Sequence, residues 1–138
     1  MNLEINKKKL ILVDMSATLI HHGHIRLIKN ASELGEVVIA LTSDEEIKKN
    51  KGYTPELNFE ERKEILLAIS FVKDVISSPW LLDMKFFKST GADFLVHGND
   101  NSNLIDKNYV IEFKRTEGIS SSIIRRRVIK AILEKANI

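Results

Sequence analysis

The 138-residue chain contains no cysteine and few residues that break regular structure, with only two prolines and six glycines. The lack of cysteine excludes a disulfide framework and thiol chemistry, and a cytoplasmic location is the expectation that fits it. No apolar run is long enough to span a membrane, so we expect no membrane insertion. The apolar run at residues 10–13 is too short for a signal peptide and ends at Asp14, so it predicts a strand.

The sequence also lacks a large excess of positive or negative charge. The 21 basic and 19 acidic residues leave a net charge of +2, which is too even to indicate a nucleic-acid partner. Hydrophobic residues make up 43% of the chain, enough for one core, so we expect a single domain over residues 1–138. The arginines at 125–127 are interpreted as a solvated helix face, because no aromatic residues are interleaved with them.

Apolar runs and helical patterns alternate along the sequence. Strands are predicted at residues 9–14, 36–43, 72–76, 93–97 and 109–113. Helices are predicted at residues 22–34, 59–70, 81–89 and 120–136. The polar, lysine-rich segment 44–53, close to Gly52 and Pro55, predicts a loop or a broken helix. This alternation predicts an α/β fold, a Rossmann-like doubly wound sheet of about five parallel strands with its ligands at the carboxyl edge.

Six residues carry predictions about helix ends and faces. Asn58 is expected to cap the second helix, with Glu61 as its capping-box partner. Gly35 is expected to end the first helix in the usual way for a glycine after the last turn. Within the second helix, the apolar side chains expected to face inward are Ile65, Leu66 and Ile69.

The stretch 14–25 joins the first strand to the first helix and carries three histidines, of which His21 and His24 are the candidate phosphate ligands on either side of Gly23. A helix N-terminus attracts phosphate, imidazoles can donate hydrogen bonds to phosphate oxygens, and glycine permits close approach of the backbone. A metal pair or plain surface histidines are the alternatives. A zinc site would need further ligands, and His97 is the only histidine outside this stretch.

A second candidate anion site lies at residues 115–122, where a strand is followed by the last predicted helix. Three serines there can cap the helix, Gly118 permits a turn, and Arg115 supplies a planar cation suited to phosphate. Taken alone, the stretch could be a plain capped helix behind a polar loop. Together, the two helix starts at one edge of a sheet fit a nucleoside triphosphate.

These motifs resemble the cytidylyltransferase family, which contains the glycerol-3-phosphate, choline-phosphate and ethanolamine-phosphate cytidylyltransferases. The family's H-x-G-H motif falls on residues 21–24 and its R-T-x-G-I-S-[ST]-[ST] motif on residues 115–122. The segment around Lys51 looks like the one that carries an essential lysine, and residues 97–100 resemble the H-G-D-D turn. Residues 15–18 depart from the family's G-T-F-D and are closer to the branch that accompanies phosphoenolpyruvate mutase in phosphonate pathways.

The resemblance implies a reaction, a cofactor and an assembly. It implies transfer of CMP from CTP to glycerol-3-phosphate, phosphocholine, phosphoethanolamine or a small phosphonate, with release of pyrophosphate. It also implies Mg²⁺ bound through the triphosphate, with Asp100 as a candidate ligand, and a homodimer. An adenylyltransferase of the same fold and a non-catalytic nucleotide-binding domain stay open as alternatives.

The resemblance also assigns roles to residues. The catalytic residues would be His21, His24, Lys51 and Arg115. The nucleotide-binding residues would be Met15, Ser16, Gly23, Gly98, Asp100, Thr116, Gly118, Ile119, Ser120 and Ser121. The acceptor-binding residues would be Trp80 and Arg62. For Trp80, ordinary core or rim packing is the alternative to an aromatic wall that takes a quaternary ammonium by a cation–π contact.

Overall fold

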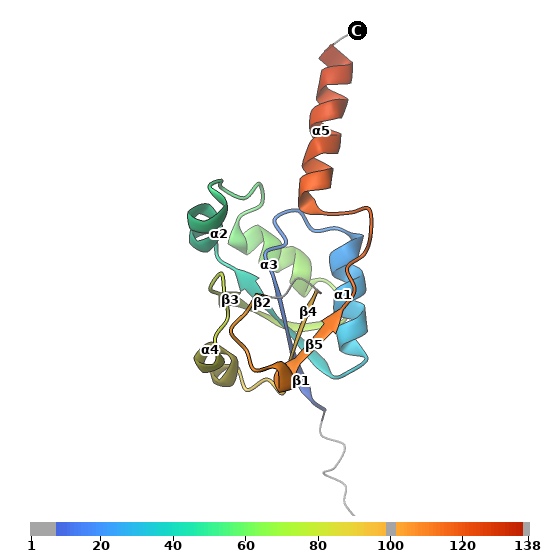
Figure 1. Cartoon of the computed structure of the whole chain (residues 1–138). Coiled ribbons are helices and arrows are strands. Elements are labelled where there is room, and N and C mark those ends of the chain that lie inside the picture. The colour runs from blue at the N-terminus through green and yellow to red at the C-terminus, as the bar shows by residue number, and fades with distance from the viewer. Residues whose placement is uncertain (1–7, 99–101, 137–138) are drawn as a thin grey trace, which may run out of the picture.

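The computed structural model describes residues 8–98 and 102–136, and Figure 1 shows an α/β fold with one central sheet. The strands are β1 (Leu10–Met15), β2 (Glu36–Thr42), β3 (Val72–Ser78), β4 (Phe94–Gly98) and β5 (Val110–Phe113). They form one five-stranded sheet in the order β3-β2-β1-β4-β5, and every neighbouring pair is parallel. The predicted fold is therefore confirmed. The order reverses beside β1, so the carboxyl end of that strand is where a doubly wound sheet binds ligands.

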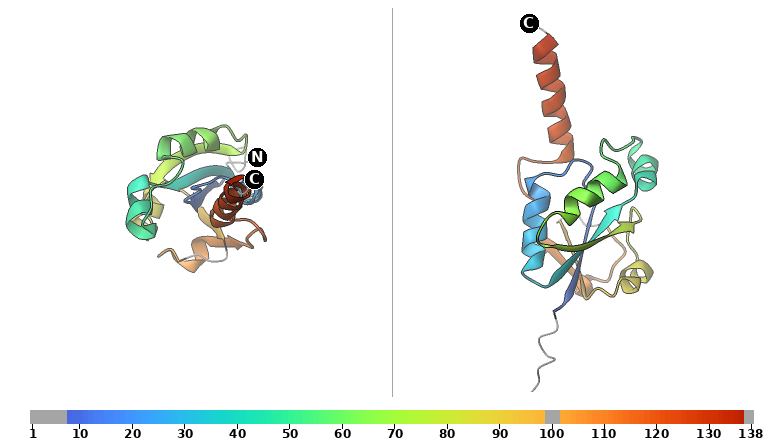
Figure 2. Two further views of the ribbon diagram at one scale, coloured as in Figure 1. Left: turned by 90° about the horizontal axis from the view of Figure 1, so that it is seen from above. Right: turned by 180° about the vertical axis from the view of Figure 1, so that it is seen from behind.

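The helices are α1 (His22–Ser32), α2 (Asp44–Lys51), α3 (Phe59–Leu67), α4 (Met84–Ser89) and α5 (Ser121–Ala136). Helices α1 and α3 cover one face of the sheet and α4 packs on the other, while α5 extends away from the body (Figures 1 and 2). Across the described residues, no helix is both long and apolar enough to cross a membrane.

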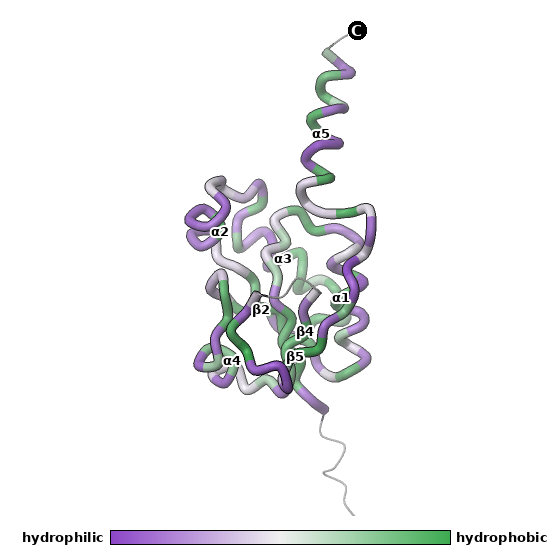
Figure 3. Tube along the Cα trace, viewed as in Figure 1, coloured by the Kyte–Doolittle hydropathy of each residue, from purple (hydrophilic) through white to green (hydrophobic). Residues whose placement is uncertain are grey.

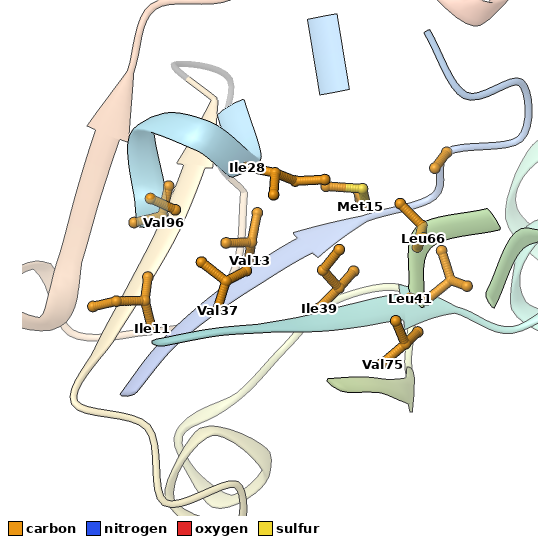
Figure 4. Close-up of a cluster of buried hydrophobic side chains, with 12 residues drawn as sticks. Ile11, Val13, Met15, Ile28, Val37, Ile39, Leu41, Leu66, Val75 and Val96 are labelled. Atoms are coloured by element: carbon orange, nitrogen blue, oxygen red, sulfur yellow. The ribbon is translucent and has the colours of Figure 1, made fainter. Parts of the chain in front are cut away.

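Side chains of β1 alternate between two cores. Ile11 and Val13 face α1 and α3, and both are fully buried (Figure 4). Leu12 points to the opposite face, where it packs with Phe87 of α4. Because both faces are covered, the strand is apolar except for Asp14 and does not alternate with polar residues.

The segment after β2 is an ordered helix, so the prediction of a loop or broken helix is wrong. The Ser43 side chain accepts a hydrogen bond from the Glu46 amide at 3.3 Å and begins α2. Gly52 ends the helix in the left-handed conformation, with φ of 78°. Figure 3 shows that α2 is almost entirely hydrophilic, and Ile47 is its buried apolar residue. With a single inward residue, α2 lacks the apolar stripe that sequence patterns detect.

Gly35 is required for a different reason from the predicted one. Helix α1 ends at Ser32 with Glu33 in the right-handed conformation, and Gly35 does not adopt a left-handed one. A Cβ atom on Gly35 would instead lie 2.3 Å from the backbone oxygen of Lys9. The glycine therefore permits close packing of two backbones at the start of β2.

Helix α3 begins as predicted and ends sooner. The capping box between Asn58 and Glu61 is confirmed, with both hydrogen bonds at 2.9 Å. Leu66 is fully buried, but Ile65 is 42% exposed, so its predicted inward position is wrong. Ile69 lies beyond the helix end and packs against the core from there.

Candidate functional site

A cavity of about 570 Å³ opens at the carboxyl edge of the sheet, a size in the range of small-molecule sites. The predicted site residues in its lining are Met15, Ser16, His21, Gly23, His24, Lys51, Trp80, Gly98, Arg115, Thr116, Ile119, Ser120 and Ser121. Two predicted residues, Gly118 and Arg62, are not part of the lining. Asp100 lies outside the described residues.

The two predicted histidines form an unusual cap at the start of α1. The Nδ1 atom of His21 accepts a hydrogen bond from the Gly23 amide at 3.1 Å. The Nδ1 atom of His24 accepts one from the His21 amide, also at 3.1 Å, and the ring centroids lie 3.9 Å apart. A neutral imidazole that accepts at Nδ1 carries its proton on Nε2. The cap therefore leaves both rings with an N–H donor at Nε2, on the edge of the ring opposite the backbone.

Both histidines are held in the neutral form. The pKa of His24 is lowered to about 3, first by burial and then by the nearby charges of His21 and Arg115. The pKa of His21 is also lowered, first by burial and then by the charges of His22 and Arg115. Neutral rings can donate hydrogen bonds to phosphate without the cost of desolvating a full charge. His22, the third histidine in the stretch, is exposed and not part of the lining.

This depressed pKa predicts a pH dependence of stability. Between pH 6.5 and 3 the unfolded chain binds a proton at His24 that the folded chain does not, so the free energy of unfolding falls as the pH falls. We expect the His24→Gln variant to lose roughly 1–2 kcal/mol less than the wild type between pH 7 and pH 5 in urea unfolding. Equal losses in the two proteins would contradict a neutral His24.

Gly23 leaves room for the two rings. A Cβ atom there would lie 2.9 Å from Cε1 and Nδ1 of His21 and 3.3 Å from Cγ2 of Ile119. The glycine therefore leaves room both for the His21 ring and for Ile119 of the second motif. This close packing adds a reason for the glycine that the sequence prediction of close ligand approach did not include.

In line with the catalytic role that the resemblance implies for His21, we expect Gly23→Ala to lower turnover by about tenfold, because the His21 ring must move. Stability should change little, since the loss of the His21 cap and the gain in helix propensity, each about 1 kcal/mol, oppose each other. Steady-state kinetics and thermal unfolding of the same sample check both parts. Unchanged turnover would show that the position of the His21 ring does not matter.

The loop after β1 has a strained conformation beside the histidines. Ala17 adopts φ of 47° and is only 3% exposed. A non-glycine residue with positive φ costs free energy and is often found at functional sites. Ala17 and its neighbour Thr18, which is 1% exposed, both line the cavity.

Helix α5 begins at the same cavity and is joined to this loop. The Ser120 side chain accepts a hydrogen bond from the Ile123 amide at 3.1 Å, which caps the helix. The Ser121 hydroxyl donates to the Leu19 carbonyl at 3.1 Å and accepts from the Leu19 amide at 3.3 Å. Gly118 adopts the left-handed conformation with φ of 78°, which confirms the predicted turn. The two sequence motifs thus meet across one cavity, 102 residues apart at this contact.

Cationic residues reach the cavity from two further elements. Lys51 is the last residue of α2, and its Nζ atom lies 5.6 Å from the ring centroid of Trp80. The Trp80 amide donates to the Glu46 carboxylate of α2 at 2.9 Å. Trp80 is partly buried and lines the cavity, so it belongs to the cavity wall and not to the core. Arg115 lies after β5 and is exposed.

Arg62 is buried behind the residues that line the cavity and is not part of the lining. Its side chain is 0% exposed, and Nη1 donates to the backbone oxygens of Ser16 at 2.7 Å and Thr42 at 2.9 Å. Nη2 pairs with Asp44 at 2.6 Å, and Nε donates to the Leu57 carbonyl at 3.0 Å. The structure thus gives no support to direct acceptor binding by Arg62. The Arg62 side chain instead joins the loop after β1 to the end of β2 through these hydrogen bonds.

A buried carboxylate contact in the cavity was missed. Asp14, at 10% side-chain exposure, pairs with Nδ1 of His97, and its other oxygen accepts from the Asn103 amide group at 2.7 Å. All three residues belong to the lining. The one sequence signal was a charged residue near the end of an otherwise apolar strand.

The described residues offer few protein ligands for Mg²⁺. They contain no group of three His, Cys, Asp or Glu side chains that could hold a metal, and Asp14 is the one carboxylate among the described lining residues. Mg²⁺ often binds through substrate phosphates with one or two carboxylates. The donor set therefore fits a Mg²⁺ carried mainly by the nucleotide, where it would neutralise phosphate charge.

At the carboxyl edge of the parallel sheet, one cavity is lined by two helix starts and by four cationic residues, Arg26, Lys51, Lys114 and Arg115. This arrangement is suited to a phosphorylated ligand. The cytidylyltransferase-like family model matches residues 16–127, and the chain belongs to this family. Relatives named as cytidylyltransferases are nucleotidyltransferases, so the family is one of enzymes.

Three relatives illustrate the similarity. The ethanolamine-phosphate cytidylyltransferase of Dictyostelium discoideum is 34% identical over 142 residues, covering 94% of this chain and 39% of the relative. The glycerol-3-phosphate cytidylyltransferase of Staphylococcus aureus is 36% identical over 118 residues, covering 80% and 87%. The FAD synthase of Thermococcus kodakarensis is 35% identical over 124 residues, covering 88% and 82%.

The chain spans about two fifths of the ethanolamine-phosphate relatives, 39% in Dictyostelium and 38% in Schizosaccharomyces pombe. Among solved structures, the lipopolysaccharide core biosynthesis protein of Thermoplasma volcanium shares the fold, with a TM-score of 0.68. The match covers 80% of this chain and 99% of that one at 18% identity, so it concerns the fold alone.

Proposed function

We propose that the chain transfers CMP from CTP to a small phosphorylated alcohol or phosphonate and releases pyrophosphate. The observation that carries this proposal is the pair of capping histidines, whose accepting Nδ1 atoms leave two neutral Nε2–H donors at one cavity. Lys51 and Arg115 add two cations to the same lining. This combination suits charge that develops on a phosphoryl group.

In the proposed reaction, an anionic oxygen of the acceptor attacks the α-phosphorus of CTP in line. The new P–O bond forms as the bond to the β,γ-pyrophosphate breaks, and the electron pair leaves with pyrophosphate. A phosphate monoester has a second pKa of about 6 and is largely dianionic at neutral pH. The step therefore requires no general base, and catalysis rests on positioning and charge stabilisation.

Each proposed role is assigned from a residue's position in the cavity. His21 and His24 would donate to oxygens of the α- and β-phosphates from the start of α1. Lys51 would neutralise charge on the α-phosphoryl group, and Arg115 with the start of α5 would hold the β,γ-phosphates. Two unit charges about 4 Å apart at an effective dielectric constant near 20 interact by about 4 kcal/mol, so each cation matters strongly.

The acceptor is proposed from the relatives and the cavity wall. Relatives are named for ethanolamine-phosphate and glycerol-3-phosphate, which share a phosphate on a short carbon chain. Trp80 lines the cavity next to Lys51, so an acceptor whose phosphate lies near Lys51 would meet the aromatic ring. We propose Trp80 as the acceptor wall, with phosphoethanolamine, glycerol-3-phosphate, phosphocholine and 2-aminoethylphosphonate as candidate acceptors.

ATP is the second candidate nucleotide. The relative named FAD synthase motivates it, because FAD contains an adenosine nucleotide. A pyrophosphate-release assay with CTP and ATP separately, Mg²⁺ and the four acceptors decides between the two nucleotides. Release with CTP and one acceptor supports the proposal, and release with ATP alone moves the chain to adenylyl transfer. If no combination of nucleotide and acceptor released pyrophosphate, the result would favour a domain that binds nucleotide without catalysis.

Three expectations accompany this function as predictions: dependence on Mg²⁺, a homodimer and a cytoplasmic location. Removal of the metal with a chelator should abolish pyrophosphate release. Sedimentation should give twice the 15.7 kDa mass of the chain.

A further inference from the structure

Arg125 of α5 lies at a junction between segments, although its place in a run of arginines predicted a solvated helix face. Its Nε and Nη2 atoms form a two-bond contact with Glu56, with 2.7 Å between Nη2 and Oε1. Nη2 also donates to the Thr18 hydroxyl at 2.8 Å. The guanidinium carbon lies 4.6 Å from the ring centroid of Tyr53. With 23% side-chain exposure, Arg125 is not the solvated residue that was predicted.

These contacts join three segments of the chain. Thr18 belongs to the loop after β1, Arg125 to the first turns of α5, and Tyr53 and Glu56 to the connection between α2 and α3. That connection begins directly after Lys51, the proposed catalytic lysine. Any force that holds Tyr53 and Glu56 therefore also restrains the position of Lys51.

The junction is built for a strong contact. A bidentate Arg–carboxylate pair is the geometry in which an ion pair contributes most, whereas isolated exposed pairs contribute little. The hydrogen bond from Arg125 lowers the pKa of Glu56, so its carboxylate is ionised at neutral pH. Thr18, the other hydrogen-bond partner of Arg125, is uncharged and almost fully buried. Glu56 is therefore the partner that balances the charge of Arg125.

We propose that Arg125 is a positioning residue for the transfer reaction, which holds the segment after Lys51 against the two phosphate-binding helix starts. This inference rests on the proposed function. Arg125 is not part of the cavity lining, so it acts through Lys51 and not on the nucleotide. Lys51 itself is exposed at the end of α2, and the connection that Arg125 contacts begins at the next residue.

The test compares Arg125→Gln and Glu56→Gln with Arg126→Gln, which changes the exposed neighbouring arginine and should leave activity unchanged. We expect each of the first two variants to lower kcat by about tenfold with the KM for CTP within about twofold, because Lys51 becomes misplaced. A rise in the KM for CTP with an unchanged kcat would overturn the proposal, since it would indicate that Arg125 binds the nucleotide directly.

A double-mutant cycle with Lys51→Ala separates positioning from general structure. In the Lys51→Ala background, Arg125→Gln should change kcat by less than about twofold, because its effect passes through the missing lysine. The same tenfold loss in both backgrounds would overturn the proposal.

Hydrogen exchange of residues 52–57 without any substrate gives a readout that does not depend on activity. Faster exchange in Arg125→Gln and Glu56→Gln than in Arg126→Gln supports the restraint, and unchanged exchange overturns it. If the wild type releases no pyrophosphate with any pair of substrates, the proposed function fails together with the catalytic part of this inference. Failure of the exchange test alone leaves the proposed function intact.

Discussion

The His24→Ala variant is expected to lower kcat by about 100-fold or more, the cost of removing one preorganised donor to a developing charge. The Nδ1 atom of His24 accepts from the His21 amide, so Nε2 carries the proton that a phosphate oxygen would accept. With its pKa lowered to about 3, the ring should act as a neutral donor at all working pH values. Steady-state pyrophosphate release measures the loss.

Two further variants separate catalysis from the cap. His24→Asn keeps an acceptor near the position of Nδ1 and lacks the Nε2 donor, whereas His24→Gln provides a donor near Nε2 and weakens the cap. We expect Asn to be as inactive as Ala and Gln to retain more turnover at lower stability. His22→Ala, in the exposed neighbour, is the matched control. A loss below about fivefold for His24→Ala would remove this residue from its proposed role.

The Lys51→Ala variant is expected to lower kcat by about 100-fold or more, since a unit charge near the α-phosphoryl group is worth several kcal/mol at an effective dielectric constant near 20. The side chain is exposed at the end of α2, so its removal should not unfold the protein. Kinetics with saturating CTP and acceptor measure the effect.

Lys49→Ala serves as the control, because Lys49 is an exposed lysine on the same helix that does not line the cavity. It should retain the wild-type kcat. If the two variants lost equal activity, the effect would come from the general charge of α2 and not from Lys51. A loss below about fivefold for Lys51→Ala would contradict its role in the reaction.

Much of the fold could be predicted, because buried parallel strands are continuous apolar runs. Residues 36–42 show this most clearly, and their strand ends within one residue of the prediction. Helix α2 escaped prediction because Ile47 is its one buried apolar residue and its other contacts with the body are polar, such as Asp44 with Arg62 and Glu46 with the Trp80 amide. The inward position of Ile65 was wrong because adjacent helix residues point in different directions, and in α3 it is Leu66 that faces the core while Ile65 is exposed.

For the site, too, local features could be predicted from the sequence and contacts between distant segments could not. Local motifs predicted the two helix starts, because a capping side chain such as that of His21 or Ser120 is adjacent in sequence to the helix that it begins. Anion binding at these two helix starts stays a prediction. Contacts between distant segments were not predictable from spacing. Asp14 meets His97 across 83 positions, and Arg125 meets Glu56 across 69. No single stretch of sequence records such pairs.

The decisive measurement for the proposed transfer is product analysis after incubation with CTP, Mg²⁺ and each acceptor, by mass spectrometry with pyrophosphate quantified in parallel. We predict a cytidine-containing adduct of one acceptor, formed in equal amounts with pyrophosphate and strongly reduced in His24→Asn. Pyrophosphate without an adduct, or equal adduct formation in wild type and His24→Asn, would contradict CMP transfer at the histidine cap.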